Sequence, residues 1–196
     1  MKLLLVDHYD SFTYNLHHYL AMITDSIDVV RMNEIAPGMA NHYDGLILSP
    51  GPGLPCRSDA TSRMIMDKDF NKPVLGICLG LQYLVTAFGG TLMNLGTVFH
   101  GISRTTTIIK PKDPVFNGIS GSITTGHYHS WVAEPQTLPR DFEVTAKDED
   151  GFIMAISHRE KPMHGLQFHP ESVLTPDGFT LLSNWVNWVS YLCKNR

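Results

Sequence analysis

The segment "PVLGICLGLQ", residues 73–82, decides the fold and raises the main chemical question of this sequence. A short apolar run ends at Ile77, Cys78 follows it, and a glycine stands two positions away on either side of the cysteine. A Gly-x-Cys-x-Gly pattern between a buried strand and a helix is typical of a nucleophile elbow, a sharp turn that closes only with small neighbours. The segment therefore predicts a strand, a strained turn that presents a thiol, and a helix.

Two interpretations of Cys78 follow from this pattern. In an elbow, the sulfur stands at the positive end of the helix dipole, which favours the thiolate. The N–H of Leu79 then points the same way as the sulfur and can help to bind an oxyanion. The alternative is that Cys78 is a small buried apolar residue, as free cysteines often are. The five residues alone leave both interpretations open.

The first half of the chain alternates apolar runs with helical patterns. Strands are expected at residues 2–6, 27–32, 44–49 and 72–77, and helices at residues 11–23, 58–70 and 79–90. Strands that are apolar on both faces and alternate with helices indicate an α/β fold with a parallel sheet covered on both faces.

The second half consists mainly of short strand-like pieces separated by turns. They lie at residues 103–110, 121–126, 131–135, 142–150 and 152–158 and predict a mixed or antiparallel extension of the sheet. Residues 164–168 are expected to return to the core as a strand, and residues 179–192 to close the fold as an amphipathic helix. No repeat, linker or low-complexity segment interrupts the sequence, so residues 1–196 are predicted to form a single domain.

Composition excludes several classes of protein. The net charge of −4 argues against a nucleic-acid binder, which needs clustered Lys and Arg. No stretch approaches the length of a membrane span, so no membrane association is expected. Three cysteines without framework spacing (Cys56, Cys78 and Cys193) indicate a reducing compartment, and we expect the protein to be cytoplasmic.

A base for the thiol is predicted in "GLQFHPES", residues 165–172. His169 follows an expected strand and precedes a proline, which places it at the carboxyl edge of the sheet together with Cys78. Glu171 is close enough to hold the tautomer of the imidazole, as the acid of a triad does. Four other histidines are alternative bases: His100, His127, His129 and His164. None of them combines a position at the end of a strand with a carboxylate as close in sequence as Glu171 is to His169.

The histidines also invite a metal hypothesis. His127 and His129 would share one face of a strand and form a possible metal pair. No third ligand can be named, so no metal site is expected. No cofactor is expected either, because a thiolate and amide dipoles suffice for acyl transfer.

The segment "LSPGPGLP", residues 48–55, predicts a loop over the same pocket. It differs from a dinucleotide-binding loop, because Cys56 occupies the third glycine position and two prolines remove backbone amides. Fixed amides from Gly51 and Gly53 suit a second oxyanion donor and contacts to a substrate. The alternative is a plain tight turn.

Together, "SPGPG", "GICLGLQ" and "QFHPES", in this order, resemble the class I (triad) glutamine amidotransferases. The resemblance implies a flavodoxin-like, doubly wound fold and a triad of Cys78, His169 and Glu171. It also implies that Cys78 attacks the side-chain amide of L-glutamine and that His169 protonates the departing ammonia. A γ-glutamyl thioester would then be hydrolysed, while ammonia passes to a synthase partner.

The resemblance further implies which residues bind the substrate. Gly51 and Leu79 would supply the amides of the oxyanion hole. The residues expected to hold glutamine are Gly51, Gly53, Leu79, Gln82, Ser130 and Trp131, the last two in "YHSW", which is similar to the family's "YHSL".

One subgroup is similar over nearly the whole chain. "VDHYDSFTYNL", "FHG", "DPVFNGI", "YHSW" and "HPESVLTPDG" resemble the amidotransferase subunits of anthranilate synthase and of aminodeoxychorismate (para-aminobenzoate) synthase. The partners of these subunits aminate chorismate, towards tryptophan or towards folate. The resemblance implies a hetero-oligomer with a chorismate-binding subunit, and the partner face is expected near "DHYDSFTYN" and residues 100–101.

Two departures from the family pattern stand out. Leu81 replaces the histidine of the usual "GICLGHQ". Because this position is outside the triad, we expect catalysis to be retained and the fine tuning of the site, or its coupling to the partner, to change. Thr97 and Phe99 also differ from the usual sequence, and tuning of the partner face is expected there. Two alternatives remain: a stand-alone Cys-His-Glu hydrolase of γ-glutamyl bonds, and a non-catalytic regulatory homologue whose only sequence support is Leu81.

Overall fold

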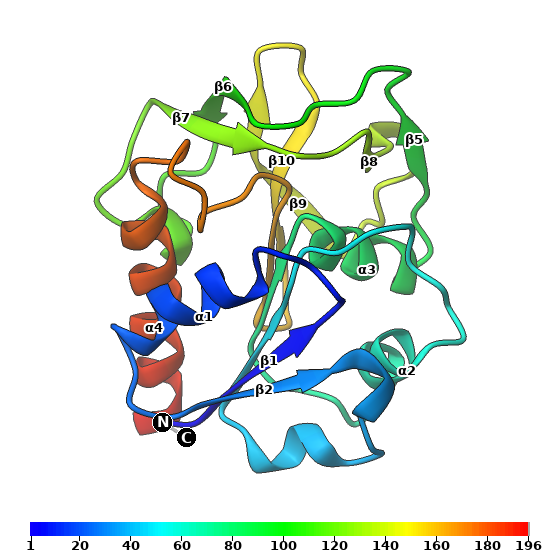
Figure 1. Ribbon diagram of the computed structural model, residues 1–196, viewed down its shortest axis with the longest axis vertical. Helices are drawn as coiled ribbons and strands as arrows, with labels where there is room; N and C mark the ends of the chain where they lie inside the picture. Colours follow the sequence, from blue (N-terminus) through cyan, green and yellow to red (C-terminus); the bar gives the residue numbers. More distant parts are fainter. Residues whose placement is uncertain (196) are drawn as a thin grey trace.

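The computed structural model describes residues 1–195 (Figure 1). Its strands are β1 Leu3–Asp7, β2 Ile27–Arg31, β3 Gly45–Leu48, β4 Val74–Ile77, β5 Leu92–Asn94, β6 Ile102–Ile108, β7 Ser122–His127, β8 Trp131–Ala133, β9 Phe142–Asp148, β10 Ile153–His158 and β11 Met163–Leu166. Its α-helices are α1 Thr13–Ala21, α2 Ala60–Met66, α3 Leu79–Ala87 and α4 Gly178–Lys194. Across residues 1–195, no helix is long and apolar enough to cross a membrane.

The described residues form a nine-stranded sheet in the order β2-β1-β3-β4-β11-β10-β9-β6-β7. The strands from β2 to β11 pair in parallel, and those from β10 to β7 continue the sheet in antiparallel pairing. The predicted parallel sheet with a mixed extension is therefore confirmed. The predicted strand at 131–135 was wrongly placed in that extension, because β8 pairs with β5 in a separate two-stranded sheet. The sequence analysis missed β5, since three residues are too few to show a period.

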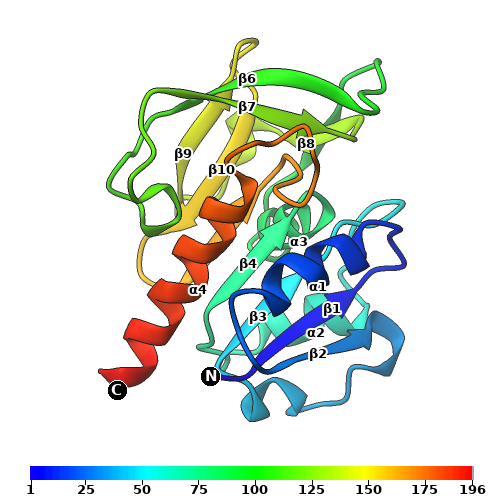
Figure 2. The ribbon, with the colours of Figure 1, turned by 60° about the vertical axis from the view of Figure 1, so that its left-hand side comes forward.

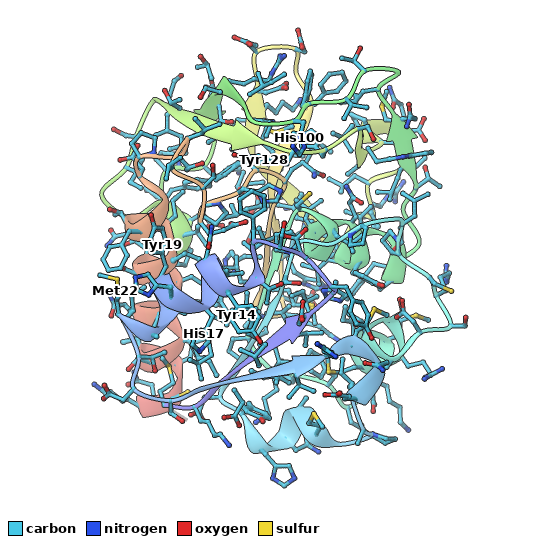
Figure 3. The ribbon with its side chains drawn as sticks, in the orientation of Figure 1. Tyr14, His17, Tyr19, Met22, His100 and Tyr128 are labelled. Carbon is cyan, nitrogen blue, oxygen red and sulfur yellow. The ribbon has the colours of Figure 1, made fainter. Side chains whose placement is uncertain are left out.

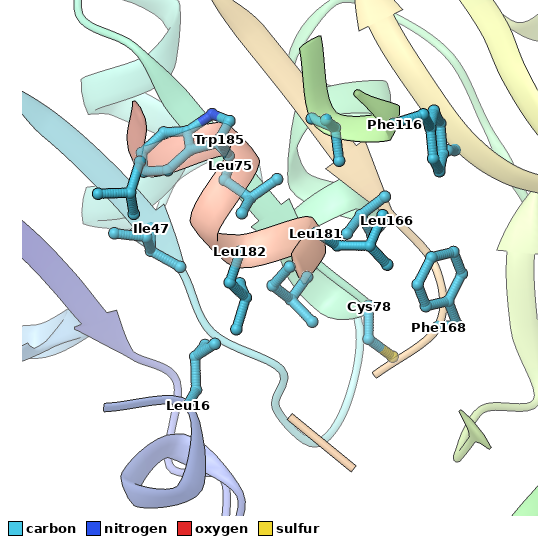
Figure 4. Packing of buried hydrophobic residues seen from close by; sticks show 14 of the residues in the cluster. Leu16, Ile47, Leu75, Cys78, Phe116, Leu166, Phe168, Leu181, Leu182 and Trp185 are labelled. Atoms are coloured by element: carbon cyan, nitrogen blue, oxygen red, sulfur yellow. The ribbon is translucent and has the colours of Figure 1, made fainter. Parts of the chain in front are cut away.

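Helices cover both faces of the parallel strands. Successive side chains of β1 point to opposite faces, so Leu3 and Leu5 join one apolar cluster while Leu4 and Val6 join another. The first cluster packs under α1 and α4 and includes Trp185 (Figure 4). The second packs under α2 and α3, on the far side of the sheet in Figure 2. Burial on both faces explains the uninterrupted apolar runs of these strands.

Two glycines let β3, β4 and α3 approach one another at backbone distance. A Cβ added at Gly76 would lie 2.4 Å from the carbonyl carbon and oxygen of Gly80. A Cβ added at Gly80 would lie 2.4 Å from the carbonyl oxygen of Leu48, at the end of β3. Real Cβ atoms do not come so close, so only glycine permits this packing. The start of α3 is thereby held at the carboxyl edge of the sheet.

We expect Gly80→Ala to lower the free energy of unfolding by about 2 kcal/mol or more, because its methyl group meets backbone that cannot yield. Gly45→Ala is a matched control, since its methyl group would meet only side chains, at 3.2 Å, and these can shift. Urea unfolding of the two variants measures the difference. Equal, small losses in both variants would contradict the role given to Gly80.

Candidate active site

Cys78 forms the predicted elbow between β4 and α3. Its backbone has φ 51° and ψ −100°, in a region that non-glycine residues rarely adopt. The N–H of Cys78 donates to the carbonyl oxygen of Leu166 on β11 at 2.7 Å, which ties the strained residue to the sheet. The side chain is only 5% exposed and lies at the edge of the apolar cluster (Figure 4). The thiol is therefore held in one place at the start of a helix, with little solvent around it.

His169 and Glu171 form a buried hydrogen-bonded pair. The distance from His169 Nδ1 to Glu171 Oε1 is 2.6 Å, and both side chains are almost fully buried. Among the residues that the structure describes, His169 Nε2 has no hydrogen-bond partner. Burial lowers the pKa of His169, but the charges of Glu171 and Cys78 outweigh this effect and raise the pKa well above its usual value. The carboxylate and the nearby sulfur therefore both favour the protonated form of this imidazole.

The turn that carries His169 is fixed by contacts distant in sequence. The N–H of His169 donates to the carbonyl of Gly126 on β7 at 3.0 Å, and Thr175 Oγ1 donates to the carbonyl of His169 at 2.7 Å. The same Thr175 hydroxyl accepts from the N–H of Gly126 at 2.9 Å. A Cβ at Gly178 would lie 1.8 Å from the carbonyl oxygen of Pro170, so α4 begins in direct contact with this turn. The sequence analysis missed Thr175, because nothing local marks a contact across 49 residues.

A cavity of about 190 Å³ opens beside Cys78. All six residues predicted to hold glutamine line it: Gly51, Gly53, Leu79, Gln82, Ser130 and Trp131. Besides Cys78, the other lining residues are Pro52, Val98, Phe99, His100, Tyr128 and His129, none of which was predicted to hold glutamine.

Aromatic rings separate His169 from the solvent. The Tyr128 ring, which lines the cavity, meets the His169 ring at a centroid distance of 4.9 Å, and the Phe12 ring does so at 5.7 Å. Tyr128 Oη is 3.0 Å from Ser172 Oγ in the turn after His169. Phe12 and Tyr128 therefore both pack against the His169 ring, and Tyr128 also lines the cavity.

Gln82 and Gln167 connect the cavity wall to the thiol. Gln82 Nε2 donates to the carbonyl of Trp131 at 3.0 Å and to Gln167 Oε1 at 3.4 Å. Gln167 Nε2 in turn lies 3.5 Å from Cys78 Sγ. The Gln82 donors are thus already engaged within the protein, and Gln167, which was not predicted, is the amide in contact with the sulfur.

The Gly-Pro-Gly loop closes one side of the cavity. A Cβ at Gly51 would lie 2.6 Å from His8 Cβ and 2.8 Å from the Leu79 side chain, so this loop is pressed against the start of α3. Gly53 has φ 81°, in the left-handed region that favours glycine. The loop is more than a plain turn, because its close packing brings the backbones of Gly51 and Leu79 to the same cavity.

The rival histidines have other environments. His127 Nδ1 and His129 Nε2 lie 3.0 Å apart, and burial lowers the pKa of His127 to about 4 and that of His129 to about 3. His164, near the start of β11, faces Asp113 at 3.6 Å, whereas His100 is exposed at the cavity rim. Within residues 1–195, no group of three or more His, Cys, Asp or Glu side chains is placed to hold a metal ion.

The departures from the family pattern fall in different places. Leu81 is fully buried, and a Cβ at Gly165 of β11 would lie 2.9 Å from its Cγ. It packs between α3 and the sheet, away from the cavity lining. Phe99, expected to tune the partner face, is part of the cavity wall, with its ring 5.6 Å from that of His129.

The segment expected at the partner face is partly exposed, and its contact with a partner stays a prediction. Tyr9 is 50% exposed and Tyr14 68% exposed. Tyr14 lies on the same face as His100 and Tyr128 (Figure 3). His8, in the same segment, is buried and cannot contribute to such a surface, because its ring stacks on Tyr83 and its Cβ lies against Gly51.

Comparison with known proteins agrees with the geometry. Residues 4–188 match the family described as glutamine amidotransferase class-I. The chain is 40% identical to anthranilate synthase component 2 of Lactococcus lactis, over 96% of this chain and 95% of that protein. It is 38% identical to aminodeoxychorismate synthase component 2 of Klebsiella aerogenes, over 94% and 99%.

A solved structure from Thermoplasma acidophilum, described as a GMP synthase protein, superimposes with a TM-score of 0.86 over 99% of this chain and 96% of that one. Its sequence identity of 24% makes this a likeness of fold, which agrees with the flavodoxin-like arrangement of the sheet. The family match and the two relatives cover nearly all of the chain, which therefore belongs to the class-I glutamine amidotransferases.

Proposed function

We propose that this chain, acting as one domain, hydrolyses L-glutamine and delivers the ammonia to a chorismate-binding synthase subunit. The observation that carries the proposal is the position of the strained Cys78. It lines one cavity together with the six predicted glutamine-binding residues, and it interacts with His169 of the buried His169–Glu171 pair. Each part comes from a different element of the fold. A cysteine with only a structural role would not require a strained backbone, a neighbouring His–Glu pair and an adjacent cavity.

The proposed reaction uses these groups in order. The Cys78 thiolate attacks the side-chain amide carbon of glutamine, and the N–H groups of Gly51 and Leu79 stabilise the resulting oxyanion. Protonated His169 gives its Nε2 proton to the amide nitrogen, the C–N bond breaks, and ammonia leaves a γ-glutamyl thioester. Neutral His169 then takes a proton from water, which attacks the thioester. The C–S bond breaks, glutamate is released, and the Cys78 thiolate and protonated His169 are restored. Glu171 holds the imidazole and stabilises its charged form.

A partner that receives the ammonia fits the relatives and the surface. The two relatives are named as second components of synthases, one for anthranilate and one for aminodeoxychorismate. The exposed aromatic residues Tyr9 and Tyr14 offer a face on which such a partner would sit. A thiolate nucleophile must stay reduced, which suits the cytoplasm.

We expect Cys78→Ser to abolish glutamine-dependent amination of chorismate while leaving amination from added ammonium salt intact. The thiol acts only in releasing ammonia, and the synthase partner uses ammonia from either source. The measurement mixes the purified chain with each candidate synthase partner and identifies the aminated product by mass. Ser58→Ala, a change at an exposed loop residue, serves as control.

An equal loss of ammonia-dependent synthesis in Cys78→Ser would remove the role assigned to the thiol. Brisk glutamine hydrolysis without any partner, and no aminated product with either synthase, would instead identify a stand-alone hydrolase. Absence of glutamate release under all conditions would identify a non-catalytic homologue.

We expect Glu171→Gln to shift the alkaline limb of kcat/KM for glutamine to lower pH. The charge of Glu171 helps to raise the pKa of His169, and without it burial lowers that pKa. Since His169 must be protonated to release ammonia, activity is lost as pH rises through its pKa, and in the variant this happens earlier. The rate itself should fall by about 10² or more.

Steady-state kinetics across neutral and alkaline pH measure this shift. Glu160→Gln, at an exposed acid on the turn after β10, is the matched control. An alkaline limb that stays in place in Glu171→Gln would show that this carboxylate does not set the protonation of His169.

A further inference from the structure

The peptide between Pro50 and Gly51 is held through its carbonyl group. Ser49 Oγ donates to the Pro50 carbonyl oxygen at 2.6 Å. In a planar trans peptide the C=O and N–H groups point in opposite directions, so fixing the carbonyl also fixes the N–H of Gly51. Ser49 is completely buried, whereas Gly51 lines the cavity. The carbonyl therefore points to the buried Ser49, and the Gly51 N–H, on the other side of the same peptide, points away from it.

His8 fixes the direction of the Ser49 hydroxyl. Ser49 Oγ accepts from the N–H of His8 at 2.9 Å and lies 3.3 Å from His8 Nδ1. A hydroxyl group has one proton and two acceptor sites. Because the proton is used on the Pro50 carbonyl, both groups of His8 must donate to Ser49. The ring proton of His8 is therefore on Nδ1.

The other side of the His8 ring agrees with this tautomer. Its Nε2 lies 3.1 Å from Thr61 Oγ1, which can donate to it. Burial lowers the pKa of His8 to about 4, so the ring is neutral at neutral pH and Nε2 can accept. The ring stacks on Tyr83 at 4.9 Å, and Tyr83 Oη donates to Asp59 at 2.5 Å. His8 is thus fixed on every side.

We infer that His8 and Ser49 are positioning residues that hold the Gly51 N–H toward the cavity before glutamine binds. The inference rests on the proposed function, because an oxyanion forms only if Cys78 attacks an amide. Neither side chain lines the cavity. Their effect is on the donor: a preoriented N–H stabilises the oxyanion without having to reorient during the reaction.

Ser49→Ala tests the inference directly. It removes the hydrogen bond to Pro50, and we expect kcat for glutamine to fall about tenfold or more, since one oxyanion donor contributes about 10² to 10³. The rate of Cys78 alkylation by iodoacetamide should not change, because the thiol and His169 are untouched. The kinetics use whichever synthase partner supports turnover.

Two substitutions at His8 separate positioning from packing. His8→Leu removes the ring donor to Ser49, leaves the backbone N–H donor in place, and should lower kcat in the same direction as Ser49→Ala. His8→Asn keeps an N–H donor near the position of Nδ1 and should retain most of the wild-type kcat. Ser122→Ala is the control, since it removes a hydroxyl that pairs with Thr107 at the outer strand β7.

The Gly51 amide resonance in ¹H–¹⁵N spectra gives a readout that does not depend on activity. It should be single and sharp in the wild type and in His8→Asn, and broadened or doubled in Ser49→Ala and His8→Leu. The wild type could hydrolyse no glutamine while the Gly51 resonance still broadens in Ser49→Ala and His8→Leu. That result would contradict the proposed function but would still support the positioning role of His8 and Ser49.

Two results would overturn the inference. One is Ser49→Ala with wild-type kcat and an unchanged Gly51 resonance. The other is an equal loss of kcat in His8→Asn and His8→Leu, which would mean that packing of the ring matters and its donor does not. If Ser49→Ala fails to fold, the two His8 variants still decide between these outcomes.

Discussion

The site depends on the close approach of three backbones at Gly76 and Gly80. Without a Cβ at either position, α3 starts directly against the ends of β3 and β4. This contact forces Cys78 into its positive-φ conformation, and the hydrogen bond from Cys78 to Leu166 retains it there. The cost of such strain, about 1–3 kcal/mol, is offset by the packing of the sheet around it. The elbow is therefore a property of the whole sheet.

The electrostatics of the site follow from burial. His169 and Glu171 lie out of water, where opposite charges attract strongly and an unpaired charge is costly. Their short hydrogen bond, together with the nearby thiol, favours the protonated form of the imidazole. Phe12 and Tyr128 exclude solvent from the same histidine. A histidine that favours its protonated form suits the proposed reaction, because an amide nitrogen is a poor leaving group until it receives a proton and can leave as ammonia.

Each half of the chain contributes one side of the site. The parallel half supplies the elbow and the Gly-Pro-Gly loop, with His8 and Ser49 beneath it. The second half supplies the "YHSW" wall and the turn that carries His169, which the carbonyl of Gly126 on β7 supports. The antiparallel extension thus has a direct function: it completes a cavity that the parallel strands alone would leave open.

Local sequence patterns determined much of this protein: the parallel sheet, its covering helices, the elbow at Cys78 and the pairing of His169 with Glu171 two residues away. Each of these features depends on residues that are close together in the chain. The periodicity of apolar residues and the absence of a side chain on glycine determine the local structure there. The tertiary structure alone decided that His8 is buried beneath Gly51, that Gln167 contacts the thiol, and that β8 leaves the main sheet for β5. These contacts join residues tens of positions apart, and no local pattern encodes which distant segments the fold brings together.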